Sequence, residues 1–382
     1  MLELNNVIQG DCIEVLKTIP DETIDCCVTS PPYYGLRDYG TGKWIGGNPD
    51  CPHRRLSKQS DKTITGHAQK ELAGNVGDAI YKTVCPLCGA VREDKQIGLE
   101  ETPEEYINKL VDVFHEVKRV LKDDGTLWVN IGDSYWGSGS RGWDFTGKFT
   151  QASELQANSK GTINLSNIPK LVGDYNGIKN KDLIGIPWML AFALRNDGWY
   201  LRQDIIWHKP NPMPESVTDR CTKSHEYIFL LSKRSHYYFD HEAIQEKAIS
   251  QDVDVLSQIK FGGKKYGENK DKKYAIYSGQ TYNPNVKNRY VMRNKRDVWD
   301  VSVKPIKKAH FATFPEKLIE PCILAGSRVG GVVLDPFFGS GTTGRVSVSL
   351  NRNYVGIELN PEYIEIANER TSNIQLSLMG MI

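Results

Sequence analysis

Residues 29 to 33 read Thr-Ser-Pro-Pro-Tyr and directly follow the apolar run of residues 24 to 28. Two consecutive prolines end a strand and fix the backbone, because proline has no amide hydrogen and a restricted φ. They therefore hold the Ser30 hydroxyl, the Pro31 carbonyl and the Tyr33 ring at the carboxyl end of the predicted strand. In open α/β sheets ligands bind at this edge. The sequence thus predicts a ligand site with polar groups beside a flat aromatic face.

A second segment with chemical potential, residues 335 to 344, reads Asp-Pro-Phe-Phe-Gly-Ser-Gly-Thr-Thr-Gly. Its glycines match the G-x-G-x-x-G pattern of dinucleotide-binding loops, and Glu358 ends the next predicted strand, where an acid would bind ribose hydroxyls. A nicotinamide or flavin dehydrogenase is therefore one interpretation. However, only one further strand and helix follow this loop's own helix, whereas a dinucleotide fold needs several units there. The missing units must precede the loop, which indicates a circularly permuted sheet.

Four residues have the types and spacing of zinc ligands. Cys51-Pro-His53 and Cys85-Pro-Leu-Cys88 are two close pairs, and Gly89 suits the tight turn of a zinc knuckle. Three thiolates and an imidazole favour a closed tetrahedral structural site, which leaves no open position for chemistry. The alternative is four unrelated side chains. We expect a metal here to anchor both ends of an insertion that has little core.

The bulk composition fits one large elaborated domain or two domains, with 382 residues of which 39% are hydrophobic. No apolar run approaches the roughly 18 residues of a membrane span, and the first residues lack the features of a signal peptide. Eight cysteines without a secretion signal argue against a disulfide framework. We therefore expect a cytoplasmic protein that does not enter a membrane.

Charge is unevenly distributed along the chain. The formal net charge is +1, but residues 260 to 310 contain 14 Lys and Arg against 4 Asp and Glu, so this segment is +10 and the remainder is −9. A basic stripe on an otherwise acidic protein indicates a polyanionic partner. A solvated loop surface would have the same composition.

Strands and helices alternate along the chain, which indicates a mainly parallel α/β sheet. A hairpin is expected where residues 226–231 and 236–239 flank Ser-Lys-Arg-Ser, after a long loop over residues 134–180. Asp123-Asp124-Gly125 is expected to turn the chain into a strand. The expected strands cover residues 6–11, 24–28, 126–131, 200–207, 226–231, 332–335 and 354–358, and the main expected helices cover residues 12–20, 102–121, 187–196 and 361–375.

Three separated motifs together resemble the circularly permuted beta group of S-adenosylmethionine-dependent DNA amino-methyltransferases. They are residues 29–33, 310–318 and 335–343, in the order that this group uses. The resemblance covers most of the chain and implies a Rossmann-like, mainly parallel seven-stranded sheet. It assigns residues 1–37 and 99–244 to the first part of the catalytic domain, 38–98 to an insertion with the zinc site, 245–305 to target recognition and 306–382 to the S-adenosylmethionine-binding part.

This resemblance implies S-adenosylmethionine as the cofactor. The Gly339 and Gly341 backbone would approach its methionine part, Glu358 would bind the ribose, and Asp11 would face the adenine. Asp11 also suits a helix cap, and each glycine also suits a tight turn. The full set of expected cofactor-binding residues is Asp11, Thr313, Phe314, Asp335, Phe337, Gly339, Gly341, Thr342 and Glu358.

The resemblance also gives Ser30, Pro31, Pro32 and Tyr33 a catalytic role. An exocyclic amine on a base is a poor nucleophile, because its lone pair is delocalised into the ring. The Ser30 hydroxyl and the Pro31 carbonyl would accept its hydrogens and turn the lone pair toward the methyl group, while the flipped base stacks on Tyr33. Tyr34 is expected in the core. Ring-carbon methylation by a cysteine is excluded, because Cys322 lies in a predicted helix far from this edge and is expected in the core.

Serine at position 30 favours N4 of cytosine, because the adenine N6 enzymes of this group more often carry Asp or Asn there; adenine N6 is the alternative. The basic segment coincides with the group's recognition region, and Arg293, Asn294 and Arg296 are predicted to read base edges of double-stranded DNA. A cognate restriction endonuclease is a further possible partner, and a monomer or a homodimer is expected. A methyltransferase of RNA or of a protein glutamine and a non-catalytic DNA-binding module are the competing functions.

Overall fold

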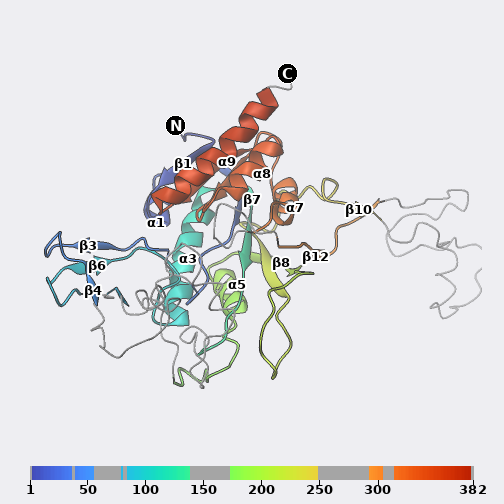
Figure 1. Cartoon of the computed structure of the whole chain (residues 1–382). Coiled ribbons are helices and arrows are strands. Elements are labelled where there is room, and N and C mark those ends of the chain that lie inside the picture. Colours follow the sequence, from blue (N-terminus) through green and yellow to red (C-terminus); the bar gives the residue numbers. More distant parts are fainter. Residues whose placement is uncertain are drawn as a thin grey trace, which may run out of the picture. The chain divides into compact units, whose positions relative to one another are not determined.

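The computed structural model describes residues 2–36, 39–55, 79–80, 84–137, 173–247, 292–303 and 314–379 (Figure 1). The chain divides into a large unit, residues 1–240 and 297–382, and a small unit, residues 241–296. No helix within the described ranges is long and apolar enough to cross a membrane. The large unit contains the sheet that carries the predicted catalytic residues.

Eight strands form this sheet, in the order β1-β14-β13-β2-β7-β9-β8-β12. Neighbouring strands are parallel except at β9, which is antiparallel to β7 and β8. The prediction of a mainly parallel sheet is confirmed. The strands span Asn6–Gln9 (β1), Ile24–Thr29 (β2), Leu121–Ile131 (β7), Tyr200–His208 (β8), His225–Ser232 (β9), Val298–Asp300 (β12), Val332–Asp335 (β13) and Asn353–Glu358 (β14).

Strands from the two ends of the chain are interleaved, since β13 and β14 lie between β1 and β2. Because these four strands and β7 are parallel, their last residues line one edge of the sheet, here named the carboxyl edge. The first residues of β9 reach the same edge, because β9 runs in the opposite direction. The opposite side, where β2, β7 and β13 begin, is named the amino edge.

Helices cover both faces of the sheet (Figure 1). On one face α3 contacts α1 and α5, and on the other α8 contacts α7 and α9. The main core fills the first interface, where Leu16, Leu110 and Leu127 are fully buried. The helices span Cys12–Leu16 (α1), Pro103–Val120 (α3), Ile186–Asn196 (α5), Glu316–Gly326 (α7), Thr342–Ser349 (α8) and Pro361–Met379 (α9).

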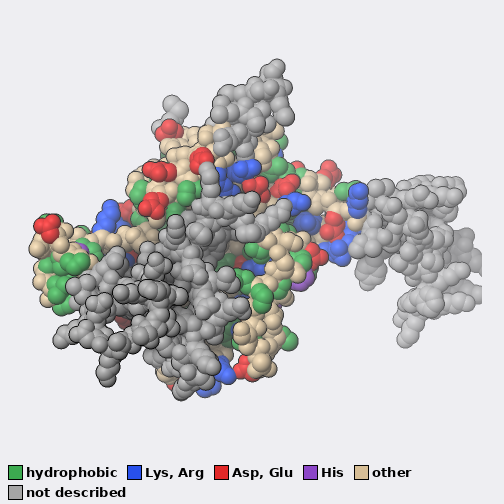
Figure 2. All heavy atoms as spheres, viewed as in Figure 1, with side chains coloured by type: hydrophobic (Ala, Val, Ile, Leu, Met, Phe, Trp, Pro, Cys, Tyr) green, Lys and Arg blue, Asp and Glu red, His purple; other side chains and the backbone are tan. Residues whose placement is uncertain are grey.

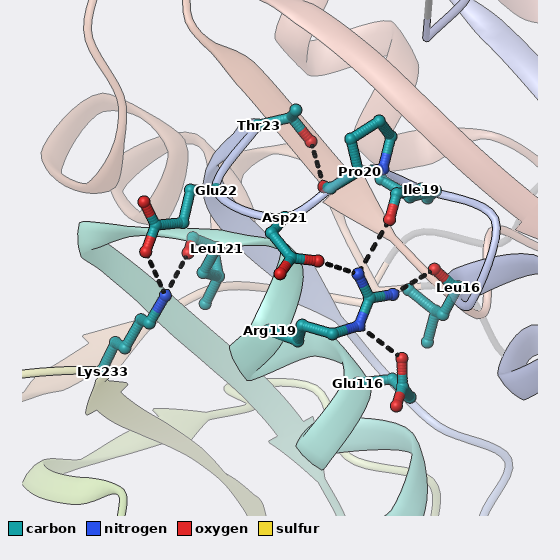
Figure 3. A network of polar contacts seen from close by, with 10 residues as sticks. All are labelled: Leu16, Ile19, Pro20, Asp21, Glu22, Thr23, Glu116, Arg119, Leu121 and Lys233. Atoms are coloured by element: carbon teal, nitrogen blue, oxygen red, sulfur yellow. Dashed lines mark hydrogen bonds and ion pairs between the residues drawn. The ribbon is translucent and has the colours of Figure 1, made fainter.

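At the amino edge Arg119, near the end of α3, joins several parts of the chain (Figure 3). Its guanidinium group donates to the carbonyl oxygens of Leu16 at 2.7 Å and Ile19 at 3.0 Å. It also pairs with Glu116 at 2.8 Å and with Asp21. These bonds satisfy carbonyl groups that follow α1 and fix α3 to the start of β2.

Three short antiparallel pairs lie outside the main sheet. The first two fall between β2 and α3, in the region predicted to be an insertion, and the third belongs to the small unit. The pairs are β3 (Lys43–Ile45) with β6 (Val91–Glu93), β4 (Arg54–Arg55) with β5 (Ala79–Ile80), and β10 (Glu246–Lys247) with β11 (Met292–Arg293).

Two expectations from the sequence are wrong. The sheet has eight strands instead of seven, because β12 pairs with β8. The hairpin over residues 226–239 is wrong because β9 pairs with β7 and β8, and residues 236–239 form no strand. The expected turn at residues 123–125 interrupts the pairing within β7, since Ile24 pairs with Leu121 and Cys26 with Thr126. The predicted core positions of Tyr34 and Cys322 are confirmed, at 2% and 1% exposed.

Candidate active site

A buried carboxyl group, Asp335 at the end of β13, joins the two sequence motifs. It accepts hydrogen bonds from the hydroxyl groups of Thr29 and Thr343, both at 2.6 Å, and from the amide of Phe337 at 3.0 Å. Burial raises the pKa of Asp335 to about 6, because desolvation outweighs these bonds. Thr29 ends β2, so Asp335 fixes the start of the Ser30 segment beside the glycine-rich loop.

The two predicted cofactor glycines have different roles in the structure. Both have positive φ, at +52° for Gly339 and +80° for Gly341, which favours glycine. A Cβ atom on Gly341 would lie 2.9 Å from the Cβ of Ala367, so this glycine lets α9 pack closely on the loop. At Gly339 the nearest atom beyond its chain neighbours would be the Phe337 oxygen, at 4.0 Å. The loop is therefore open beside Gly339.

Glu358, at the end of β14, binds the same loop. Its carboxylate accepts from the amides of Gly339 and Asn360, both at 2.8 Å, and burial raises its pKa above the ordinary value. Asp11 follows the neighbouring strand β1 and caps α1, where it accepts two amides of the first turn at 3.1 and 3.2 Å. The structure thus shows the helix-cap role of Asp11, and contact with an adenine stays a prediction.

The remaining predicted cofactor residues surround this loop or precede α7. Phe337 is half-buried and packs against the main core. Thr342 is buried at the start of α8, and Phe314 is half-buried just before α7. Thr313 lies outside the described residues.

Tyr33 is held by its hydroxyl group. It donates to Glu226 at 2.7 Å, and the side-chain oxygen of Asn130 lies at 3.3 Å. Burial and the charge of Glu226 raise the pKa of Tyr33 well above the ordinary value, so Tyr33 stays protonated. The neighbouring Ser30 side chain has the opposite effect on the Tyr33 pKa, which it lowers, but this effect is smaller. Gly132 leaves room for the ring, since a Cβ atom there would lie 2.7 Å from it.

The two proline carbonyls differ in their partners. The Pro32 carbonyl accepts the Tyr106 hydroxyl at 2.8 Å. No donor in the described part of the chain binds the Pro31 carbonyl. The role of the Pro31 carbonyl as an acceptor for the amine stays a prediction, whereas the Pro32 carbonyl holds the loop on α3.

Sequence reasoning missed the charged groups around Tyr33. Lys209 pairs with Glu226, and its ammonium group lies 4.3 Å from the centroid of the Trp207 ring. Lys223 donates to the Asp133 carbonyl at 2.9 Å, and burial lowers the pKa of Lys223. A sequence signal for Glu226 exists, because an acidic residue at the start of an apolar strand is unusual unless it is paired.

The predicted metal ligands are brought together, although 34 residues separate Cys51 from Cys85. The four ligand atoms of Cys51, His53, Cys85 and Cys88 all lie within 4.8 Å of one another. This cluster belongs to the region between β2 and α3.

The small unit contains the three predicted base-reading residues. The Arg293 and Arg296 side chains lie 2.8 and 2.7 Å from the same carboxylate oxygen of Glu246, and Asn294 is exposed. Most of the basic segment, residues 260–291 and 304–310, lies outside the described residues. Base reading stays a prediction, and it must use guanidinium groups that already bind a carboxylate.

Known proteins share this arrangement. Residues 24–369 match the N6/N4 family model described as DNA methylase. The chain is 42% identical over 371 residues to type II methyltransferase M.Cfr9I of Citrobacter freundii, across 97% of this chain and 89% of that protein. It is also 42% identical over 364 residues to type II methyltransferase M.SmaI of Serratia marcescens, across 95% and 89%.

A solved structure has the same fold. The structure of PvuII DNA methyltransferase (cytosine-N4-specific) superposes with a TM-score of 0.51 at 17% identity, over 95% of this chain and 85% of that chain. The family match covers both motifs that Asp335 joins and most of the sheet between them. The chain therefore belongs to the N6/N4 DNA methylase family of S-adenosylmethionine-dependent DNA amino-methyltransferases.

Proposed function

We propose that this chain transfers a methyl group from S-adenosylmethionine to N4 of cytosine in double-stranded DNA. The observation that carries the proposal is the Asp335 junction. Its bonds to Thr29 and Thr343 hold the Ser30 segment and the glycine-rich loop side by side at the carboxyl edge. If the Ser30 segment holds the base and the glycine-rich loop holds the cofactor, their position side by side brings the two reactants together.

The residues at this edge suit the cofactor. Asp335 is buried and Glu358 is half-buried, neither carboxyl group pairs with a cation in the described residues, and the methionine part of the cofactor carries positive charge. The open side of Gly339 allows a ligand to approach the backbone. When bound, the cofactor supplies an electrophilic methyl group. Glu358 would accept the ribose hydroxyls.

The chain Ser30–Tyr33–Glu226 prepares Ser30 as an acceptor. Tyr33 donates to Glu226 at 2.7 Å, and Ser30 beside it would donate its proton to the Tyr33 oxygen, so the Ser30 oxygen would keep its lone pairs for an amine hydrogen. The charge of Glu226 polarises both hydroxyl groups in the same direction. The Pro31 carbonyl accepts the second amine hydrogen. Together they turn the amine lone pair out of the ring plane.

The amine must also lose a proton when it gains the methyl group. Once the amine nitrogen had taken the methyl group that the cofactor would supply, it would carry one proton too many. The hydroxyl groups of Ser30 and Tyr33 give that proton a path to Glu226, which later releases it to solvent. Lys209 pairs with Glu226 and holds that carboxyl group in place beside Tyr33.

Serine supports cytosine as the target, by resemblance to the family, in which adenine enzymes more often carry Asp or Asn at this position. Adenine N6 is the second candidate, because a neutral hydroxyl and a carbonyl can hold either amine. A base turned out of the duplex would stack on Tyr33. RNA and protein glutamine are less favoured substrates, since the relatives of high identity are named type II methyltransferases.

The biological setting follows from the same relatives. M.Cfr9I and M.SmaI are named as type II methyltransferases, so we propose a cognate restriction endonuclease and action on the DNA of the cell, in the cytoplasm. The position of β13 and β14 between β1 and β2 supports the circular permutation inferred from the sequence. A monomer or a homodimer remains the expected state.

Nucleoside mass spectrometry tests the proposal. Unmethylated duplex DNA is incubated with the protein and S-adenosylmethionine, with Ser30→Ala in parallel. N4-methylcytosine that Ser30→Ala fails to make supports the proposal. N6-methyladenine would keep the mechanism and correct the base. The absence of any methylated nucleoside from protein that binds the cofactor would overturn it, and RNA and protein substrates would then be assayed.

A further inference from the structure

We propose that Cys51, His53, Cys85 and Cys88 bind one structural zinc ion. The Cys51 and Cys85 sulfurs are 3.7 Å apart, and the Cys88 sulfur is 3.6 Å from Nδ1 of His53. Tetrahedral zinc with Zn–S bonds of about 2.3 Å and a Zn–N bond of about 2.0–2.1 Å requires S–S and S–N separations of about 3.8 and 3.6 Å. The side chains therefore have the spacing of a zinc shell.

The backbone around the second cysteine pair has the form of a metal-binding knuckle. Gly89 has a φ of +74° and donates its amide to the Cys85 carbonyl at 2.7 Å.

Close packing around the Cys88 sulfur requires a glycine in the facing turn. A Cβ atom on Gly47 would lie 2.8 Å from that sulfur. Gly47 has a φ of +73°, in the region that glycine adopts readily. The turn before Cys51 is thus shaped around the cluster.

His53 is oriented by stacking. Its ring lies parallel to that of Trp44 in β3, with centroids 4.5 Å apart and 11° between the planes. Trp44 is held in place because β3 pairs with β6, where its partner is Arg92. The Trp44 ring therefore gives the His53 imidazole a fixed surface to stack on. Such support of a ligand by its surroundings is typical of a metal site.

The β3–β6 ribbon, residues 43–55 and 84–93, has too little core to stabilise itself. Among its described apolar side chains only those of Cys85 and Ala90 are fully buried. Figure 2 shows apolar side chains gathered at the surface of this region, at the left of the view. The exposed ones are Ile45, Val84, Leu87 and Val91. Small regions of this kind usually depend on a metal or a disulfide.

A disulfide explains the cluster less well. An S–S bond is about 2.05 Å long, whereas the Cys51 and Cys85 sulfurs lie at 3.7 Å. A bond between those two sulfurs would also leave Cys88 and His53 without a role. Four protein ligands close the coordination shell, so the metal would be structural and would take no part in methyl transfer.

Metal analysis of the full-length protein, purified without chelator, tests the site. We expect about one zinc ion per chain, as for a closed four-ligand site. Cys88→Ser should lose the ion, and Cys221→Ser, which changes an exposed cysteine outside the cluster, should keep it. Absence of zinc from the native protein, or its retention in both Cys88→Ser and His53→Ala, would overturn the proposal.

A second measurement does not depend on the folding of a variant. The native protein loaded with Co²⁺ should show the intense thiolate charge-transfer and tetrahedral d–d absorption of a Cys₃His site. An octahedral spectrum, or a disulfide between two of these cysteines found by mass spectrometry, would contradict the assignment. Because the shell is closed, the cobalt protein should methylate DNA as fast as the zinc protein. Failure of the zinc proposal would leave the proposed methyl transfer intact.

Discussion

The two edges of the same sheet both bury charged groups, but with different partners. At the amino edge Asp25 in β2, 5% exposed, pairs with Lys122 at 2.9 Å and accepts the Val332 amide at 2.9 Å. At the carboxyl edge Asp335, 1% exposed, is bound by two threonine hydroxyl groups and one amide. The difference is that Asp25 pairs with a cation, whereas Asp335 pairs with none among the described residues.

This difference separates structure from function. Within the fold, Lys122 balances the charge of Asp25. At the same edge Arg119 and Lys233 donate hydrogen bonds to backbone carbonyl oxygens (Figure 3). The pKa of Asp335 rises to about 6 because only neutral groups oppose its burial. A buried carboxyl group with a raised pKa and only neutral partners is typical of a functional site. We infer that the amino edge holds the fold together and the carboxyl edge binds the reactants.

The largest effect on catalysis is expected for Ser30→Ala. Loss of a hydrogen-bond group that acts on the reacting amine should lower kcat by roughly 10² to 10³-fold, with little change in cofactor affinity. The matched control is Thr23→Ala at the amino edge, whose hydroxyl donates to the Pro20 carbonyl at 2.9 Å. Comparable activity loss in the two variants would remove the distinction between the edges.

A pH experiment sharpens the role of Asp335. Its pKa is about 6 in the folded protein against an ordinary 3.8, so between these values the folded state binds more protons than the unfolded chain. The contribution of Asp335 to stability is therefore greatest below pH 3.8 and is lost as the pH rises to 6, by about 3 kcal/mol in all.

Asp335→Asn removes this titration. The difference in the free energy of unfolding, variant minus native, should increase between pH 5 and pH 7.5 in urea denaturation. The reason is that the native protein loses the contribution of Asp335 over this range and the variant does not. A constant difference over that range would mean that Asp335 is ionised in the fold already at pH 5.

Tyr33→Phe tests the hydroxyl chain to Glu226. The ring remains, but Ser30 loses its bond to Tyr33, so kcat should fall by roughly 10²-fold while KM for DNA changes little. Tyr354→Phe is the control, because its hydroxyl bonds Thr371 away from the site at 3.3 Å. A rise in KM with kcat unchanged would assign Tyr33 to base binding alone.

Arg119→Met tests whether the amino edge stabilises the fold without taking part in the reaction. It leaves the carbonyl groups of Leu16 and Ile19 without their donor, so the free energy of unfolding should fall by about 2 kcal/mol. The kcat of the folded fraction should stay the same. A loss of kcat at unchanged stability would connect this edge to the reaction.

Much of the fold could be predicted from the sequence, because its signals are local. Residues 332–335 were expected as a strand and form β13, and the Thr102-Pro103 helix start is confirmed, with Thr102 accepting the Glu105 amide at 3.2 Å. The strands that pair with a given strand can be distant in the sequence, and a local pattern does not show them. The spacing of residues 226–239 for this reason predicted a hairpin, whereas β9 in fact lies between β7 and β8.

The candidate site shows the same division. The residues at the ends of β2, β13 and β14 could be predicted, since parallel strands gather their last residues at one edge. The contacts of Asn130 and Glu226 with Tyr33 could not be predicted, because they form only once the antiparallel β9 lies beside β7. The close contact of Gly341 with Ala367 also could not be predicted, because α9 comes later in the sequence, and the cofactor role of Gly341 stays a prediction.

The most direct test compares S-adenosylmethionine binding to Asp335→Asn and Asp25→Asn by calorimetry. Each variant removes one buried negative charge at nearly constant shape, one from each edge. We predict that Asp335→Asn weakens binding at least about tenfold, or 1.4 kcal/mol, whereas Asp25→Asn, although less stable, binds as the native protein does. Native affinity in Asp335→Asn, or an equal loss in both variants, would contradict the assignment of the carboxyl edge to the cofactor.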